Sequence, residues 1–312
     1  MKVEQIYWTE SGSWTSSFSE EFKKKANLVF IFGDRKHVEK NELINEIKNA
    51  YPTALLVGCS TAGEICDTRV LDSSLVSTAI IFEKTKLQCS SVGVSDPKES
   101  YDAGKKLGKQ LNPKELVQAV ILSDGLKVNG SELVKGLLES LPENVGLTGG
   151  LAGDGNMFEK TLVFNDGLPK SDNLVLLGFY GNDLKVSYES MGGFVPFGPE
   201  RLVTKAKGNI LYELDDQPVI ELYKKYLGDE KGTDLAKNQF NFPLSFRTET
   251  MKTPVVRTIL AIDENSGSMT FAGNISEKGY CRLMRTNFNR LIDGAINAAE
   301  TSLSALKSDS PD

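Results

Sequence analysis

The stretch that decides the fold runs from residue 28 to residue 64 and reads LVFIFGDRKHVEKNELINEIKNAYPTALLVGCSTAGE. Its first five residues form a continuous apolar run, which is typical of a strand buried on both faces. Apolar residues then recur at positions 43, 44, 47, 50 and 51, the spacing of one buried helical stripe, and Pro52 ends that helix. A second apolar run leads into a loop of small residues. This order predicts a βαβ crossover with parallel strands, which brings Asp34 and the loop 58–64 to one edge of the sheet.

The same arrangement returns about ninety residues later in the chain. An apolar run, a helical stripe and a second small-residue loop, at 149–155, follow one another again. A register of residue n with residue n+90 pairs identical residues: Asp34 with Asp124, Val38 with Val128, Glu42 with Glu132, Leu43 with Leu133, Pro52 with Pro142, Ala62 with Ala152 and Gly63 with Gly153. This register predicts a duplication, with chance similarity of two βα units as the alternative. Two further strands complete each copy, and we expect them to form hairpins, 75–83 with 87–94 and 174–180 with 184–191.

The composition excludes several classes of function. The chain has 312 residues, 40% hydrophobic and 25% charged, with a net charge of −6 and no basic stretch, so nucleic acid is excluded as a principal ligand. No apolar run reaches the roughly 18 residues of a spanning helix, so we expect no membrane insertion and a cytoplasmic protein. Four scattered cysteines indicate reduced thiols rather than disulfides. The single histidine, His37, argues against zinc sites and Ser-His-Asp triads, and we expect no metal and no resident cofactor.

The two small-residue loops are the first candidate ligand site. Loops of this kind leave backbone N–H groups uncovered and can bind an anion at the carboxyl edge of parallel strands. We select Ser60, Thr61 and Glu64 from the first loop, and Gly150 and Asp154 from the second. The alternative interpretation is tight packing of the duplicated halves, where only small residues fit.

Two aspartates follow the first strand of each copy, Asp34 and Asp124. A carboxylate at this position can hold a ligand's ammonium group, but it can equally cap a helix. We select Asp124 as the stronger ligand candidate, with Asp154 as the other carboxylate for an ammonium group. Neither loop is a Walker motif, and the sequence around Ser60 is one residue longer than a nucleophile elbow, so nothing here predicts an enzyme.

The composition changes at the segment 195–199, which holds two prolines and predicts a domain boundary. A hairpin turning at 207–209, a short helix at 219–227, strands at 255–262, 268–272 and 280–285 and a final helix at 288–303 are expected beyond it. Three arginines, Arg257, Arg282 and Arg285, lie in the strand-like stretches. One of them is a candidate for clamping a ligand carboxylate, and a surface position or an internal salt bridge is the alternative for each.

Four motifs follow one another along the chain: GCSTAGE at 58–64, GGLAGD at 149–154, LYELD at 211–215 and RLMR at 282–285. In this order they resemble the FIST domain of F-box and intracellular signal-transduction proteins. The resemblance covers most of the chain. It suggests an N-terminal extension, 1–26, a duplicated α/β domain, 27–195, and a smaller α+β domain, 196–312, in a mixed α/β fold overall.

The resemblance implies a cytoplasmic, non-enzymatic sensory module for a small molecule, an amino acid or a related metabolite. Its output is expected from a fused domain or a partner, such as a histidine kinase, a chemoreceptor or a cyclic-nucleotide enzyme of two-component signalling and chemotaxis. The sensor regions take up all 312 residues, so no output domain is visible. Some members bind haem and sense nitric oxide, and His37 is the one imidazole that could serve as axial ligand here. A ligand-independent interaction scaffold is the further alternative.

Overall fold

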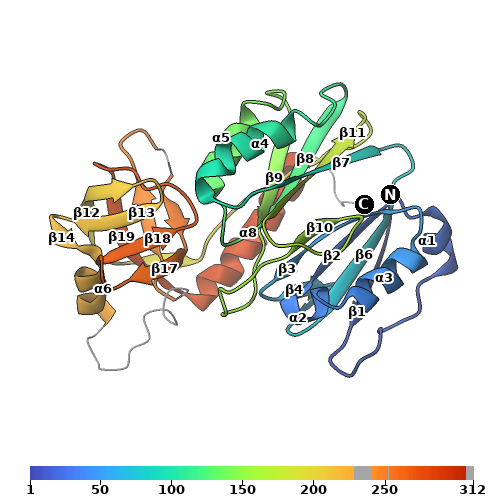
Figure 1. Cartoon of the computed structure of the whole chain (residues 1–312), viewed down its shortest axis with the longest axis horizontal. Coiled ribbons are helices and arrows are strands. Elements are labelled where there is room, and N and C mark those ends of the chain that lie inside the picture. Colours follow the sequence, from blue (N-terminus) through green and yellow to red (C-terminus); the bar gives the residue numbers. More distant parts are fainter. Residues whose placement is uncertain (228–240, 252, 307–312) are drawn as a thin grey trace. The chain divides into compact units, whose positions relative to one another are not determined.

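The structure is a computed structural model and describes residues 1–227, 241–251 and 253–306. The chain divides into two compact units (Figure 1). The first comprises Met1–Val128 and Leu133–Val186, and the second comprises Asn129–Glu132 and the described residues from Ser187 onward. The predicted boundary at 195/196 falls inside a strand of the second unit, Phe194–Lys207. Both units combine helices and strands, as expected for a mixed α/β chain.

The first sheet of the first unit has the order β1 (Lys2–Trp8), β6 (Leu75–Ile81), β2 (Leu28–Asp34), β3 (Leu55–Thr61) and β10 (Val163–Asn165). Strands β2 and β3 run parallel, and α2 (Arg35–Val38) and α3 (Asn41–Ala50) connect them. The predicted βαβ crossover is therefore confirmed. Its register pairs Asp34 with Thr61, so the aspartate and the loop after β3 lie at one edge of the sheet.

The second sheet has the order β7 (Lys86–Gly93), β11 (Asn173–Tyr180), β8 (Leu116–Ser123) and β9 (Gly146–Leu151). Strands β8 and β9 are also parallel and are joined through α5 (Gly130–Leu138), which confirms the second predicted crossover. Helix α4 (Ser100–Gly108) precedes β8 along the chain. The central three strands, β11, β8 and β9, repeat the order and directions of β6, β2 and β3. Duplication of the sequence itself stays a prediction.

The two predicted hairpins are wrong. Strand β6 pairs with β2 and β1, whereas β7 pairs with β11 in the other sheet. Residues 184–191 form no strand. The physical reason lies at the edges of the sheets: residues 2–8 of the expected extension occupy the free edge of β6, and β7 occupies the free edge of β11. A strand adjacent in sequence can pair only where an edge is open.

The first unit is layered as helix, sheet, sheet and helix (Figure 1). One apolar cluster lies between the first sheet and the helices α1 (Glu20–Lys25) and α3, and another between the second sheet and α4 and α5. A third cluster fills the space between the sheets and includes Leu28 and Val57 from one and Leu122 and Val175 from the other. Both sheets are thus covered on both faces, which explains the continuous apolar runs of their strands.

The second unit contains a strongly bent sheet with the order β16 (Val255–Arg257), β15 (Leu244–Arg247), β19 (Tyr280–Thr286), β12 (Phe194–Lys207), β13 (Ile210–Leu214), β18 (Ser268–Phe271) and β17 (Ile259–Asp263). The short β14 (Gln217–Pro218) also pairs with β13, and α6 (Val219–Leu227) and α8 (Phe288–Leu306) complete the described unit. The expected β12–β13 hairpin, helix α6, strand β19 and final helix are confirmed. The expected strand 255–262 is divided into β16 and β17, which pair with different neighbours.

Three short elements lie in the loops of the first unit. Strands β4 (Glu64–Cys66) and β5 (Arg69–Leu71) pair with each other just after β3. A 3-10 helix, Pro97–Glu99, leads into α4. Along the described parts of the chain, no helix is both long and apolar enough to cross a membrane.

Candidate functional site

The loops at the carboxyl edge of the first unit are tied together through Ser60. Its side chain is fully buried, and its hydroxyl oxygen accepts a hydrogen bond from the Leu162 N–H at 3.0 Å. Its backbone N–H donates to the Leu162 carbonyl, and its carbonyl accepts from the Gly153 N–H at 2.9 Å. Ser60, near the end of β3, therefore connects this strand to the loop after β9 and to Leu162 through hydrogen bonds within the protein.

Glu64 is a carboxylate with 2% of its surface exposed. It accepts hydrogen bonds from the Thr61 hydroxyl at 2.6 Å and from the Ser74 hydroxyl at 2.7 Å and N–H at 3.3 Å. All three donors are neutral. Thr61 and Glu64, both selected from the sequence, thus contact each other and hold the turn between them.

Asp124 is 2% exposed and has four hydrogen-bond donors around its carboxylate. Oδ1 accepts from the N–H groups of Leu126 and Lys127, both at 2.8 Å. Oδ2 accepts from the Thr161 hydroxyl at 2.8 Å and from the Asp172 N–H at 3.3 Å. A carboxylate accepts about four hydrogen bonds, so the protein itself fills the capacity of this one.

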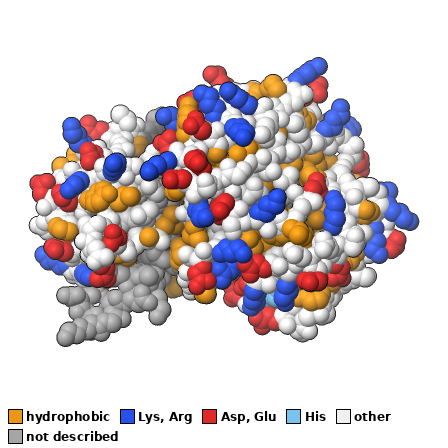
Figure 2. Space-filling model, viewed as in Figure 1, with side chains coloured by type: hydrophobic (Ala, Val, Ile, Leu, Met, Phe, Trp, Pro, Cys, Tyr) orange, Lys and Arg blue, Asp and Glu red, His pale blue; other side chains and the backbone are white. Residues whose placement is uncertain are grey.

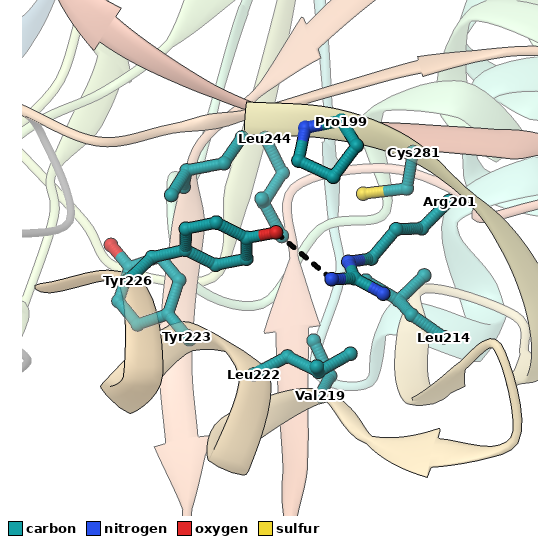
Figure 3. Close-up of a pocket in the computed structure, with 10 residues that line it drawn as sticks. Pro199, Arg201, Leu214, Val219, Leu222, Tyr223, Tyr226, Leu244 and Cys281 are labelled. Atoms are coloured by element: carbon teal, nitrogen blue, oxygen red, sulfur yellow. Dashed lines mark hydrogen bonds between the residues drawn. The ribbon is translucent and has the colours of Figure 1, made fainter. Parts of the chain in front are cut away.

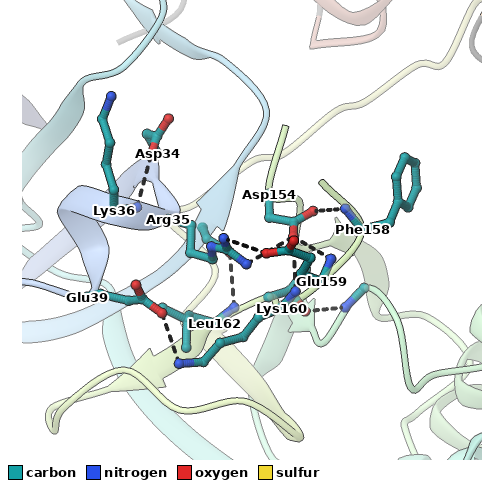
Figure 4. A network of polar contacts seen from close by, with 12 residues as sticks. Asp34, Arg35, Lys36, Glu39, Asp154, Phe158, Glu159, Lys160 and Leu162 are labelled. Atoms are coloured by element: carbon teal, nitrogen blue, oxygen red, sulfur yellow. Dashed lines mark hydrogen bonds and ion pairs between the residues drawn. The ribbon is translucent and has the colours of Figure 1, made fainter. Parts of the chain in front are cut away.

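Asp154 organises the loop that follows β9 (Figure 4). Its carboxylate accepts from three successive backbone N–H groups, of Phe158, Glu159 and Lys160, at 2.8–3.0 Å. The Arg35 guanidinium lies 3.5 Å from the same carboxylate and 3.0 Å from that of Glu159. Arg35 was not among the residues selected from the sequence, although it directly follows Asp34 at the end of β2, where the chain reaches this edge.

Gly150 is exposed in β9, and a Cβ added to it would meet open space. The polar residues selected in the first unit are brought to one edge of the sheets, where each carboxylate already accepts hydrogen bonds from the protein. The partly exposed Arg35 lies at the same edge.

The three arginines selected from the sequence lie in the second unit and do not converge. Arg282 and Arg285 are both on β19, three residues apart, so they point to opposite faces of the sheet. Arg282 lies close enough to Glu200 to help lower the pKa of that carboxyl, after the larger effect of Arg247, which pairs with Glu200 at 2.5 and 2.8 Å. Arg285 is exposed and stacks on Phe197, 5.9 Å from the ring centre.

Arg257 has a different environment. It lies on β16, and its Nη2 donates to the Ser131 hydroxyl at 3.1 Å. No Asp or Glu among the described residues lies within ion-pair distance of it. A Cβ at Gly273 would collide with the guanidinium, so the cation lies directly over the backbone there. Burial lowers the pKa of Arg257 below its ordinary value, and no charged group of the described residues offsets this effect.

Among the described residues, each of two cavities is lined by residues of one unit: one cavity lies in the second unit and the other in the first. One, inside the second unit, has about 20 Å³ of free space, the room of roughly one water molecule. Leu214, Leu222 and Tyr223 line it, and the Arg201–Tyr226 hydrogen bond of 2.9 Å closes it (Figure 3). The other is an open groove of about 550 Å³ in the first unit, where β3 and β7 begin and β10 ends. No pattern in the sequence predicted this groove.

The described residues give little support for metal or haem. No cluster of three His, Cys, Asp or Glu that could hold a metal ion occurs in the described part of the chain. His37 is 5% exposed, and its Nε2 lies 2.9 Å from the Ser73 carbonyl oxygen. Burial lowers the pKa of His37, the largest of several effects. With one nitrogen paired to the backbone and the ring buried, His37 does not fit an axial haem ligand.

Comparison with known proteins supports the assignment that the motifs suggested. The FIST N domain matches residues 27–217, and the FIST C domain matches residues 220–308. An uncharacterized protein of Methanocaldococcus jannaschii, MJ1623, is 22% identical over 308 residues. That alignment covers 89% of this chain and 58% of the relative, so the chain spans little more than half the length of the curated relative that it matches. The chain belongs to the FIST family, whose domains are sensory domains of signalling proteins.

Proposed function

We propose that this chain is a cytoplasmic, non-enzymatic sensory module that binds a small metabolite, such as an amino acid, through a carboxylate held by Arg257. The observation that carries the proposal is the uncompensated guanidinium in the second unit. Ser131 supplies the single side-chain acceptor that the described residues give to Arg257, although a guanidinium has five N–H donors. Arginine is rarely buried without a partner, because a desolvated charge costs several kcal/mol.

A ligand carboxylate suits the guanidinium of Arg257 in geometry and in charge. The planar fork of the guanidinium matches a carboxylate with two parallel hydrogen bonds. Burial of Arg257 strengthens such a pair, because water competes less for the donors. The other two arginines are less suitable, since Arg282 lies near Glu200 and Arg285 is exposed on Phe197.

An amino acid would also need a carboxylate of the protein to accept hydrogen bonds from its ammonium group. Asp124 and Asp154 were the sequence candidates, but the carboxylate of each already accepts four hydrogen bonds from the protein, one of those to Asp154 coming from Arg35. We therefore propose a binding residue, Arg257, for the carboxylate of the ligand and none for its ammonium group. The signal would pass to an output domain or partner, for which a histidine kinase, a chemoreceptor and a cyclic-nucleotide enzyme are the candidates.

The test is a thermal-shift screen of the chain against the twenty amino acids and simple carboxylic acids, followed by calorimetric titration of each hit. A ligand at a hundred times its Kd adds about 2.7 kcal/mol to stability, enough for a shift of several degrees. Arg257→Gln removes the charge and keeps two N–H donors. We expect it to weaken binding by roughly tenfold to a hundredfold, the value of a charged hydrogen bond.

Arg285→Gln is the matched control, because it removes the same charge from an exposed position on β19. It should bind the ligand as the unchanged chain does. Equal affinity in the Arg257 and Arg285 variants would remove Arg257 from the site. A screen without any hit on folded protein would favour the interaction scaffold instead.

A further inference from the structure

The groove in the first unit lies at the amino ends of β2 and β3, the end opposite to the loops that the sequence selected. Its volume of about 550 Å³ is in the range of small-molecule sites, which run from roughly 300 to 1,000 Å³. Its residues come from α3, from the starts of β3 and β7 and from the end of β10. Segments far apart in the sequence thus build it, and all of them belong to the first unit.

Three of the residues that line the groove have apolar side chains, Leu55, Leu87 and Cys89, and they are partly buried against the apolar cluster between the two sheets. Burial raises the pKa of the Cys89 thiol to about 12, so the thiol is neutral at physiological pH. An apolar part of a ligand can therefore contact these three side chains and lose contact with water, which is favourable in proportion to the area covered.

The rim of the groove carries charged side chains in fixed positions. The Asp166 N–H donates to the Leu56 carbonyl at 2.9 Å, and the Leu56 N–H donates to Asp166 Oδ1 at 3.1 Å. Lys48 Nζ donates to the same Oδ1 at 2.9 Å and to the Ala54 carbonyl at 3.0 Å. Lys48 keeps one N–H free of these contacts, since an ammonium group has three.

Lys86 adds a second ammonium group to the rim. It is exposed and makes no ion pair or hydrogen bond with any described residue. Two lysines and one aspartate leave the groove with an excess positive charge of one, on a chain whose net charge is −6. A locally positive cavity attracts anions, whereas the protein as a whole repels them.

We propose that this groove is a second binding site, which takes a small organic anion with an apolar body, its head group at Lys86 and Lys48 and its body on Leu55, Leu87 and Cys89. The head group is a carboxylate or a phosphate monoester, which share the same hydrogen-bonding and charge requirements. This site is separate from the one proposed at Arg257, because its residues lie in the first unit.

The probe is hexanoate, with acetate and hexylamine as comparisons and hexyl phosphate for the other head group. We expect titration calorimetry to detect hexanoate or hexyl phosphate, and not acetate or hexylamine at the same concentration. Lys86→Gln should weaken binding up to about fivefold, as for a solvated ion pair. Lys84→Gln is the matched control, since Lys84 is two residues away and pairs with Asp183 outside the groove. Arg257→Gln should also bind hexanoate normally.

Equal binding of hexylamine and hexanoate, or equal affinity of the Lys86→Gln and Lys84→Gln variants for hexanoate, would each overturn the proposal.

Discussion

Asp124 shows how a residue chosen for ligand chemistry can have a structural role instead. Its four donors come from its own turn, from Thr161 and from Asp172, and Thr161 in turn accepts from the Gly125 N–H at 2.9 Å. The carboxylate thus connects three segments that are far apart in the sequence. Sequence position alone, at the end of a strand, is common to ligand-binding and loop-holding aspartates.

We predict that Asp124→Asn destabilises the chain by about 1–3 kcal/mol, because either orientation of the amide places an NH₂ group against N–H donors. Asp34→Asn is the control, since Asp34 accepts from one backbone N–H, that of Lys36. Urea unfolding of the two variants compares them. An Asp124 variant as stable as the Asp34 variant would contradict the prediction and return Asp124 to the list of ligand candidates.

His37 gives a prediction about pH. Burial lowers its pKa in the folded state below the ordinary value of 6.5, so the unfolded chain binds more protons between these two values. The unfolding free energy should therefore be independent of His37 above about pH 7 and should fall as the pH drops through 6.5 toward the folded pKa.

His37 is the single histidine of the chain, so its replacement isolates this effect. Urea unfolding at intervals from pH 7.5 to 5.5 should give a smaller decline for His37→Gln than for the unchanged chain. Parallel curves would show that the histidine titrates alike in both states.

At the scale of elements, helix α4 packs closely against α5 through glycines. A Cβ at Gly136 would collide with the Tyr101 carbonyl of α4, and one at Gly104 would press on α5 near Leu133. The backbones of the two helices therefore approach each other without side chains between them. This contact fixes the helix layer over the second sheet, whose apolar cluster includes Leu133 and Leu137.

We predict that Gly136→Ala is destabilising, even though alanine is the better helix former by roughly 1 kcal/mol. The collision with backbone atoms cannot be relieved by rotating a side chain, and overpacking of this kind costs typically 1–3 kcal/mol. Gly150→Ala is the control, because a Cβ there meets open space. Thermal unfolding of both variants tests this, and a Gly136 variant that melts higher than the parent would mean that the helices can separate at little cost.

At the scale of the whole chain, the similarity of the two sheets goes further than the sequence indicated. Strand β1 lies beside β6 as β7 lies beside β11, so residues 2–8 take the place that 86–93 take in the other sheet. Phe22 and Ala26 also belong to the core of the first unit. The register of n with n+90 begins at the strand β2 and does not reveal this part, because β1 (2–8) and β7 (86–93) lie 84 to 85 residues apart rather than ninety.

The sequence by itself determined the βαβ crossovers, several elements of the second half, namely the β12–β13 hairpin, α6, β19 and the final helix, and the family. These follow from local periodicity, from proline and glycine positions and from motifs, which one sequence carries completely. Tertiary structure alone decided that β6 and β7 belong to different sheets, because pairing depends on which edges other strands leave open. The tertiary structure also decided which charged groups already have hydrogen-bond or ion-pair partners within the protein. Asp124 and Arg257 were both candidate ligand contacts in the sequence. In the fold, Asp124 receives four hydrogen bonds from the protein, whereas Arg257 has no counter-charge among the described residues.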